Sequence, residues 1–170
     1  MLYLLDANVL ITAKDSYYPV DAVPEFWAWL EHMATAGHVK IPLEIFEEIK
    51  DGPANEDVDL LFAWIQRTDI KEALILNEEV DAQKVSLVVS SGYANDLQDS
   101  EVEQIGRDPF LLAYALGNPN RCIVTAEVSK PSLKRQNRRV PDVANNLNIN
   151  HCNPFQFNKR LGFRTTWHLP

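Results

Sequence analysis

LYLLDANVLI, residues 2–11, is the stretch that decides the fold. Leu2 to Leu5 form a short apolar run, which predicts a buried strand. Asp6 ends this run, and Asp6-Ala7-Asn8 opens a helical stretch that continues to Ile11. In open parallel sheets, binding sites form at the carboxyl ends of the strands, so Asp6 stands where a site is expected.

The rest of the chain continues the alternation of strand and helix. Further strands are expected at 38–41 and 122–125, and a short one at 74–76. Helices are expected at 24–36, 42–50, 57–66, 109–116, 141–147 and 154–161, with two more within 78–106 around Ser90-Ser91-Gly92. This order predicts an α/β three-layer sandwich with a mostly parallel central sheet, formed as one domain by residues 1–170.

Composition is that of a globular protein. The chain has 170 residues, 46% of them hydrophobic and 24% charged. No apolar run approaches the ~20 residues of a membrane helix, and the first residues carry no basic leader, so a cytoplasmic location is expected. Two isolated cysteines, Cys122 and Cys152, argue against a zinc site or a disulfide framework, and the four histidines show no metal-ligand spacing.

Charge is unevenly spread along the chain. Residues 1–103 carry 21 acids and 6 bases, whereas residues 104–170 carry 3 acids and 10 bases. A basic C-terminal third can face phosphates or an acidic protein even when the net charge of the whole chain is −8. Two of its three acids, Asp108 and Glu127, belong to the site proposed next.

Four acids are expected to meet at one edge of the sheet. Asp6 and Glu127 each follow a strand, and Asp108 precedes the helix 109–116, which leads back into the strand 122–125. Helix and strand have similar lengths, at ~1.5 and ~3.3 Å per residue, so the chain returns to the level of Asp108. Glu48 lies on the second turn of a helix that starts at the same edge.

Clustered carboxylates repel one another, and a divalent cation removes the conflict. Ligands that are all oxygen atoms favour Mg²⁺ or Mn²⁺ over zinc. Such ions bind phosphate oxygens, generate hydroxide from water and stabilise a leaving oxygen. The sequence therefore predicts a metal site formed by Asp6, Glu48, Asp108 and Glu127.

Four motifs resemble those of the PIN-domain family. LLDANVLI (4–11) resembles the opening strand with Asp6 and Asn8, and IPLEIFEEI (41–49) the second motif with Glu48. DPFLLAYAL (108–116) resembles the third motif, which starts with Asp108, and IVTAE (123–127) the fourth, with Thr125 and Glu127. The fourth acid is commonly Asp in that family. The tail from Arg139 through VPDVANNLNI to Phe163 is similar to a poorly characterised PIN-like branch.

The resemblance implies Mg²⁺- or Mn²⁺-dependent hydrolysis of RNA phosphodiesters. It also implies a VapC-type toxin, neutralised by a protein antitoxin, and a homodimer. The four acids would be both the catalytic residues and the metal ligands, with Asn8 and Thr125 in support.

Each candidate also has a purely structural interpretation. Asp6 and Asp108 could cap the helices that they precede, and Glu127 could be an exposed loop acid. Glu48 could lie on a solvated helix face, with Glu44 as the acid in its place. Asn8 and Thr125 could serve turns or caps, and Asp142 is interpreted as a helix-start acid.

A basic run follows the candidate site, with no acid between Val128 and Pro141. It consists of Lys130, Lys134, Arg135, Arg138 and Arg139. We expect it to bind the RNA backbone with a steep salt dependence. The alternatives are a solvated loop and a docking segment for an acidic antitoxin.

Trp27 and Trp29 cannot share one face of a helix, which suggests that one of them marks a subunit contact. Two other functions compete with the ribonuclease. An Asp after the first strand also suits a phosphotransferase or phosphatase, although the second Asp usual two positions on is Asn8 here. A catalytically impaired nucleic-acid- or protein-binding module is the other.

Overall fold

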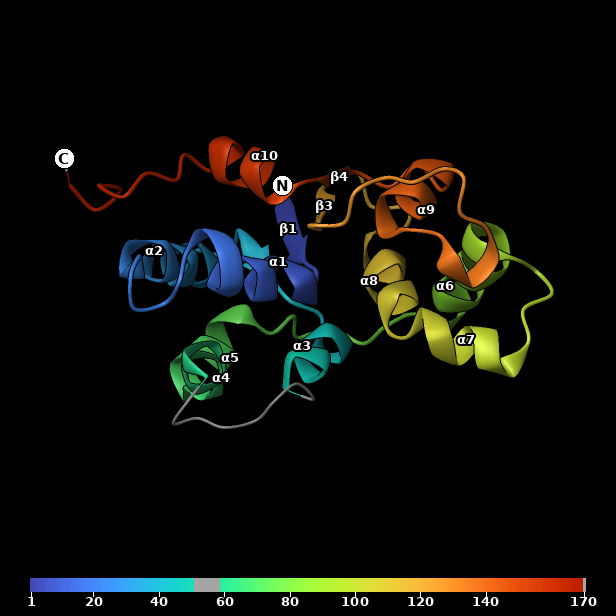
Figure 1. Ribbon diagram of the computed structural model, residues 1–170, viewed down its shortest axis with the longest axis horizontal. Coiled ribbons are helices and arrows are strands. Elements are labelled where there is room, and N and C mark those ends of the chain that lie inside the picture. The colour runs from blue at the N-terminus through green and yellow to red at the C-terminus, as the bar shows by residue number, and fades with distance from the viewer. Residues whose placement is uncertain (51–58, 170) are drawn as a thin grey trace.

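The computed structural model describes residues 1–50 and 59–169, and within them a parallel sheet is covered by helices (Figure 1). The strands are β1 (Leu2–Leu5), β2 (Val39–Lys40), β3 (Arg121–Val124) and β4 (His151–Cys152). The helices are α1 (Ala7–Thr12), η1 (Ala13–Tyr17), α2 (Pro24–Thr35), α3 (Leu43–Lys50), α4 (Leu60–Gln66), α5 (Thr68–Leu74), α6 (Ala82–Leu87), η2 (Val88–Tyr93), α7 (Asp99–Ile105), α8 (Asp108–Ala115), η3 (Arg135–Asn137), α9 (Val140–Asn146) and α10 (Pro154–Arg160). The predicted three-layer α/β sandwich is confirmed.

All four strands run parallel, in the order β2-β1-β3-β4. β1 is one of the two inner strands of the described sheet. Its side chains Tyr3, Leu4 and Leu5 are buried, as expected for a strand covered on both faces. Leu5 is in register with Val124 of β3. The residues that follow these two strands therefore emerge side by side at one edge of the sheet.

The strand expected at 74–76 forms only a single parallel bridge, Ile41 to Ile75. The preceding residues instead form α5, which the sequence analysis did not anticipate. β4 was also unanticipated, because two residues are too few for an apolar pattern to be visible. The first two residues of the helix expected at 57–66 lie outside the described residues.

The expected break at Ser90-Ser91-Gly92 was wrong. α6 continues into the π-helical segment η2, which passes through these residues and ends at Tyr93. Gly92 permits the close approach of η2 and α9, because a Cβ atom there would lie 2.6 Å from Val143 Cγ1. In the sequence Gly92 indicated a turn, but in the structure it allows two helices to pack closely.

The suggestion that Trp27 or Trp29 marks a subunit contact was also wrong. Both are buried within the chain, because α2 is covered on two sides. Trp27 packs against Trp64 of α4 with ring centroids 5.0 Å apart. Trp29 packs against Phe157 of α10 at 5.6 Å.

Cys122 and Cys152 are both buried and not disulfide-bonded, with their Sγ atoms 3.7 Å apart on neighbouring strands. Among the described residues, no helix is long and apolar enough to cross a membrane.

Candidate functional site

The centre of the candidate site is a hydrogen-bonded set formed by Asp6, Asn8 and Thr125. Asn8 Nδ2 and Thr125 Oγ1 both donate to Asp6 Oδ2, over 2.6 and 2.7 Å. Asn8 Oδ1 in turn accepts from the backbone N–H of Ala126 at 2.8 Å. β1 and β3 position this set directly, because their ends are in register. Asn8 and Thr125 thus orient the carboxylate of Asp6.

Asp6 does not act as a helix cap. It precedes α1, but its side chain forms no capping hydrogen bond. The residue is only 4% exposed, and this burial raises the pKa of its carboxyl from 3.8 to about 6. The hydrogen bond from Thr125 lowers the pKa, while the nearby charges of Glu127 and Glu48 raise it. A buried carboxylate whose pKa is raised in this way is typical of functional sites.

Asp108 reaches the same place from the start of α8. It is the first residue of that helix, after Arg107, and not its cap. Desolvation raises its pKa well above the ordinary value, and the charges of Asp6, Glu127 and Glu48 raise it further. Arg139 lowers it. Asp108 and Asp6 therefore lie within range of each other's charge, although 102 positions separate them in the sequence.

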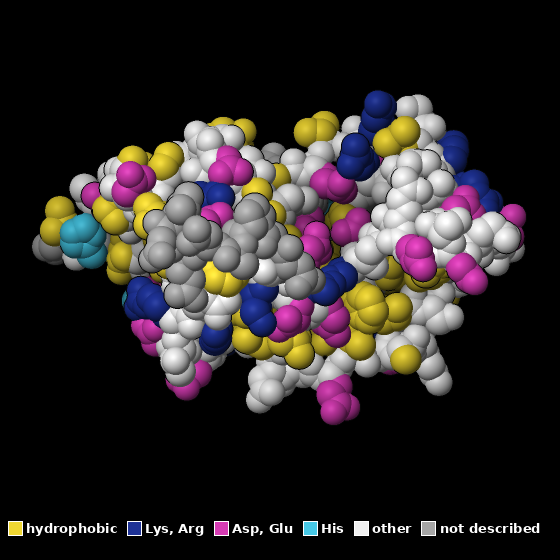
Figure 2. Space-filling view, turned by 60° about the horizontal axis from the view of Figure 1, so that its bottom comes forward, with side chains coloured by type: hydrophobic (Ala, Val, Ile, Leu, Met, Phe, Trp, Pro, Cys, Tyr) yellow, Lys and Arg dark blue, Asp and Glu magenta, His cyan; other side chains and the backbone are white. Residues whose placement is uncertain are grey.

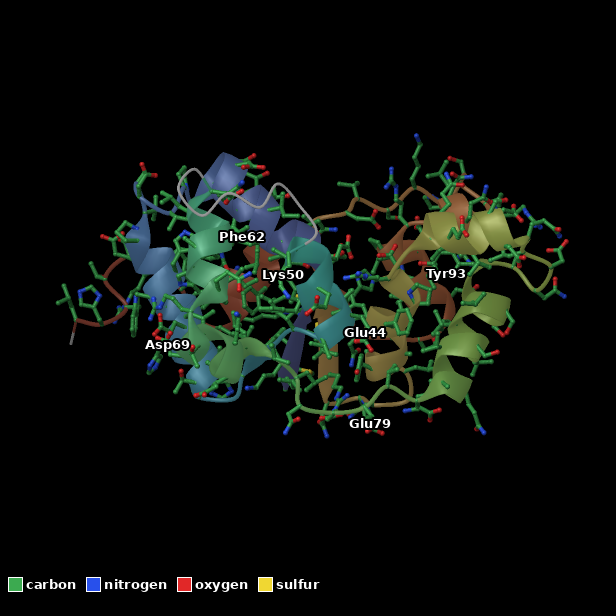
Figure 3. The ribbon with its side chains drawn as sticks, turned by 90° about the horizontal axis from the view of Figure 1, so that it is seen from below. Glu44, Lys50, Phe62, Asp69, Glu79 and Tyr93 are labelled. Carbon is green, nitrogen blue, oxygen red and sulfur yellow. The ribbon has the colours of Figure 1, made fainter. Side chains whose placement is uncertain are left out.

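The two acids of α3 that the sequence offered lie in different surroundings. Glu48 raises the pKa of both Asp6 and Asp108, and it lines the same cavity as Asp108. Glu44, one turn earlier, instead raises the pKa of Tyr114, and its backbone carbonyl accepts a hydrogen bond from Arg107 Nη1 at 2.8 Å. Figure 3 shows Glu44 and Lys50 at opposite ends of α3. Glu48 and not Glu44 therefore lies with Asp6, Asp108 and Glu127, and we call these four residues the acid cluster.

Both carboxylate oxygens of Glu127 have partners within the chain. Oε1 accepts from Arg139 Nη1 at 2.9 Å, and Oε2 from the backbone N–H of Val140 at 2.7 Å. Its own N–H donates to Thr125 Oγ1 at 3.1 Å. Glu127 is therefore not a free loop acid, and each of its oxygens accepts one hydrogen bond from within the chain. It ties the end of β3 to the start of α9.

A cavity of about 680 Å³ opens beside these residues, and we call it the acidic cleft. Its acidic lining residues are Glu48, Asp108 and Glu127. Its basic lining residues are Arg107, Lys130, Arg138 and Arg139. Figure 2 shows acidic side chains gathered in the hollow of this face, with basic side chains near its edges. Such a mixture of charges suits a phosphate that is held together with a cation.

Within residues 1–50 and 59–169, no three His, Cys, Asp or Glu side chains are grouped closely enough to hold a metal ion on their own. The donor chemistry nevertheless fits Mg²⁺ or Mn²⁺. Mg²⁺ keeps several waters and is commonly held by one or two carboxylates together with substrate phosphates. Asp6 and Asp108 would provide such a pair, because the charge of Asp6 raises the pKa of Asp108 and a cation would relieve this repulsion.

Tyr93 is a residue that sequence reasoning missed. It is 6% exposed, and its hydroxyl has no hydrogen-bond partner within the described part of the chain. Burial raises its pKa, and Asp108, Glu127 and Asp6 add to the shift, so the hydroxyl lies near the acid cluster (Tyr93 is labelled in Figure 3). No sequence signal marked it, because it ends a segment that the motifs do not cover. A buried donor without a partner is costly unless a ligand or water satisfies it.

The basic run divides into two groups. Arg135 forms ion pairs with Asp96 and Glu101, and Arg138 donates to the carbonyls of Gly92 and Asp142. Lys130 and Lys134 are exposed, and neither forms an ion pair with a described residue. Only part of the run is therefore available to an external phosphate.

Asp142 holds this loop in place. It is buried, and its carboxylate accepts from Ser129 Oγ and, at 2.8 Å, from the N–H of Lys130. The sequence indicated only a helix-start acid. Asp142 lies 12 or more positions from the residues that it binds, so no local sequence pattern indicated these contacts.

Comparison with protein families gives one match, which covers nearly the whole chain. Residues 3–165 match the model of a domain of unknown function, DUF4411. The chain belongs to the DUF4411 family. All residues of the acid cluster, the basic run and Tyr93 lie inside the matched DUF4411 region. No curated protein and no solved structure matches the chain.

Proposed function

We propose that this DUF4411 domain is a metal-dependent ribonuclease. The observation that carries the proposal is the convergence of Asp6, Asp108 and Glu48, from three separate elements, beside a cleft that also contains cationic side chains. Each of the two aspartates is held in an environment that resists its ionisation. Proteins keep such groups where a cation or a reaction requires them.

The residues would divide the work as follows. Asp6 and Asp108 would hold Mg²⁺ or Mn²⁺, directly or through water, with Glu48 at the rim of the cleft. Asn8 and Thr125 orient Asp6 through its Oδ2. Glu127 keeps Arg139 at the cleft, where that guanidinium can bind a phosphate oxygen. The bound metal would supply a nucleophilic hydroxide and stabilise the leaving oxygen.

Tyr93 supports the same proposal. Its buried hydroxyl is a donor near three carboxylates, which are acceptors, yet it donates to no described residue. A phosphate oxygen or a water molecule held beside these carboxylates would satisfy it. Its place next to the acids is expected if the cleft has evolved to hold a ligand.

A second candidate function is a catalytically impaired module that binds nucleic acid or protein. The observation that favours it is Glu127, because both of its carboxylate oxygens accept hydrogen bonds from Arg139 and Val140. This module would use the basic rim of the cleft without turnover. It would bind the same RNA with unchanged affinity when Asp108 is replaced.

The proposed biological setting is that of a type II toxin, controlled by a protein antitoxin and acting in the cytoplasm, with a homodimer as a further expectation. It rests on the motif resemblance and on the basic run, which would face either RNA or an acidic antitoxin segment. The gene beside this one tests it, because a small DNA-binding protein encoded there is the partner expected of such a toxin.

The test of the ribonuclease is cleavage of a labelled single-stranded RNA by the purified chain, with Mg²⁺ or Mn²⁺ and with chelator. We expect metal-dependent cleavage that Asp108→Ala lowers by at least roughly 10²–10³-fold, as for the loss of a group that stabilises transition-state charge. Glu103→Ala, an exposed acid on the neighbouring α7, is the control and should cleave normally. RNA binding without cleavage in any metal would favour the module.

The two exposed lysines of the basic run give a prediction on salt. Replacing Lys130 and Lys134 by Ala should flatten the dependence of log affinity on log salt by about 0.7 for each lysine lost on single-stranded RNA. Arg135→Gln is the matched control. Its charge is already paired with Asp96 and Glu101, so it should leave the slope unchanged. Equal slopes for the double lysine variant and wild type would exclude these lysines from the RNA interface.

A further inference from the structure

A second cavity, of about 430 Å³, lies on the other side of Glu127, and we call it the apolar pocket. It is formed by the end of α1, η1, the segment after β3, and the start of α10. Thr125 and Glu127 line it, so it adjoins the acid cluster directly. Glu127 also lines the acidic cleft and is thus the wall between the two cavities.

The lining of the apolar pocket differs from that of the cleft. Among the described residues that line it there is no Lys or Arg, whereas the cleft has four. It has instead two aromatic rings, Tyr17 and Phe155, which are 48% and 53% exposed. Their ring centroids are 4.9 Å apart and the rings are tilted by 72°, so they make an edge-to-face pair and not a stack. Val128 beside them is 81% exposed.

These observations identify the occupant by its chemistry. A phosphate would find no cation in the pocket, but a flat, apolar ring would find exposed aromatic surface. The volume lies in the range of small-ligand pockets, about 300–1,000 Å³. Single-stranded RNA is commonly recognised by bases that are splayed out and stacked on aromatic side chains.

We propose that the apolar pocket is a nucleobase subsite, which receives the base next to the phosphate held in the acidic cleft. This inference rests on the proposed ribonuclease function and adds the substrate class, a single-stranded segment with an unstacked base. The backbone of the bound RNA passes from one cavity to the other at Glu127. Its phosphate lies on the side of the basic residues, and its base lies on the side of Tyr17 and Phe155.

The subsite binds by stacking with little choice of base. Three of its polar side chains already bond within the chain: Asn153 and Gln156 each accept from the other's backbone N–H group, and Ser129 donates to Asp142. His151 Nε2 is paired with Asn145 Oδ1 at 2.9 Å. Stacking on aromatic rings is tolerant of sequence, because every base has a π-face.

The test measures binding of short single-stranded RNAs that contain 2-aminopurine, with Ca²⁺ in place of Mg²⁺, by fluorescence quenching. We expect Phe155→Ala and Tyr17→Ala to weaken binding by roughly 10- to 100-fold, in the range of losing one base stack. Phe155→Trp should restore it. Leu87→Ala, an equally exposed apolar residue on α6, is the matched control. Thermal melting verifies that each variant is folded.

An RNA with one abasic position decides whether the base is what binds. Wild type should bind the abasic RNA as weakly as Phe155→Ala binds the intact one, and Phe155→Ala should not distinguish the two. Equal binding of both RNAs by wild type would overturn the proposal. So would unchanged RNA affinity in Phe155→Ala together with loss of self-association in sedimentation, which would assign the pocket to a second copy of the chain.

These results are separable from those on the ribonuclease itself. Base-dependent quenching without cleavage in any metal would contradict the proposed ribonuclease activity and support the nucleobase subsite. Cleavage by Phe155→Ala with kcat and KM both unchanged would support the ribonuclease activity and contradict the nucleobase subsite.

Discussion

Asp6→Asn should make the protein more stable and, at the same time, inactive. The carboxyl of Asp6 has its pKa raised from 3.8 to about 6, so its ionisation opposes folding above pH 6. At about 1.4 kcal/mol per pKa unit, the opposition amounts to roughly 3 kcal/mol. For a chain of this length, the melting temperature should rise by roughly 5–10 °C at pH 7.5 without metal.

The size of the effect depends on pH. The native pKa is the higher one, so the native state is favoured most below pH 3.8, and this advantage is lost as the pH rises through 6. The gain from Asp6→Asn should therefore be large at pH 7.5 and small at pH 4.5. Asp21→Asn, at an exposed acid, should change neither stability nor cleavage. A lower melting temperature for Asp6→Asn at pH 7.5 would contradict this account.

Metal affinity should fall steeply as the medium becomes acidic. A cation at Asp6 and Asp108 must displace the protons that their raised pKa values retain. Below pH 6 the Mn²⁺ dissociation constant should rise about tenfold per pH unit for one displaced proton, and up to about a hundredfold for two. Isothermal titration in buffers of different ionisation enthalpy measures both the affinity and the number of protons released.

Thr125→Val gives the matched comparison for that titration. It removes the hydroxyl that donates to Asp6 Oδ2 and leaves Asp6 and Asp108, the two proposed ligands, in place. Loss of such a supporting group typically lowers metal affinity 10–100-fold, so this variant should bind Mn²⁺ more weakly at every pH. An affinity that is constant from pH 5 to 7.5 in wild type would remove the two aspartates from the metal site.

The sequence predicted the parts of the site that follow from strand ends. Asp6 and Glu127 follow apolar runs that predict buried strands, and parallel neighbours bring the ends of such strands together. Asp108 followed from matching the lengths of a helix and a strand. These arguments use only local patterns and the geometry of regular elements.

What the sequence could not predict depends on contacts between distant segments. The partners of Glu127 are Arg139 and Val140, and Arg135 is bound by Asp96 and Glu101. These bonds depend on how the loop after β3 folds back, which no periodicity encodes. Tyr93 lies near the acids because η2 runs on from α6 without a break, where the glycine and serines suggested a turn.

The central place of β1 has a consequence for synthesis. This strand is made before the other strands of the described sheet, but one of its two neighbours, β3, begins at Arg121. The hydrogen bond from Thr125 to Asp6 joins residues 119 positions apart. A ribosome must therefore add at least 119 residues after Asp6 before Asp6 and Thr125 can meet, and nascent fragments that stop short of β3 carry Asp6 without Thr125.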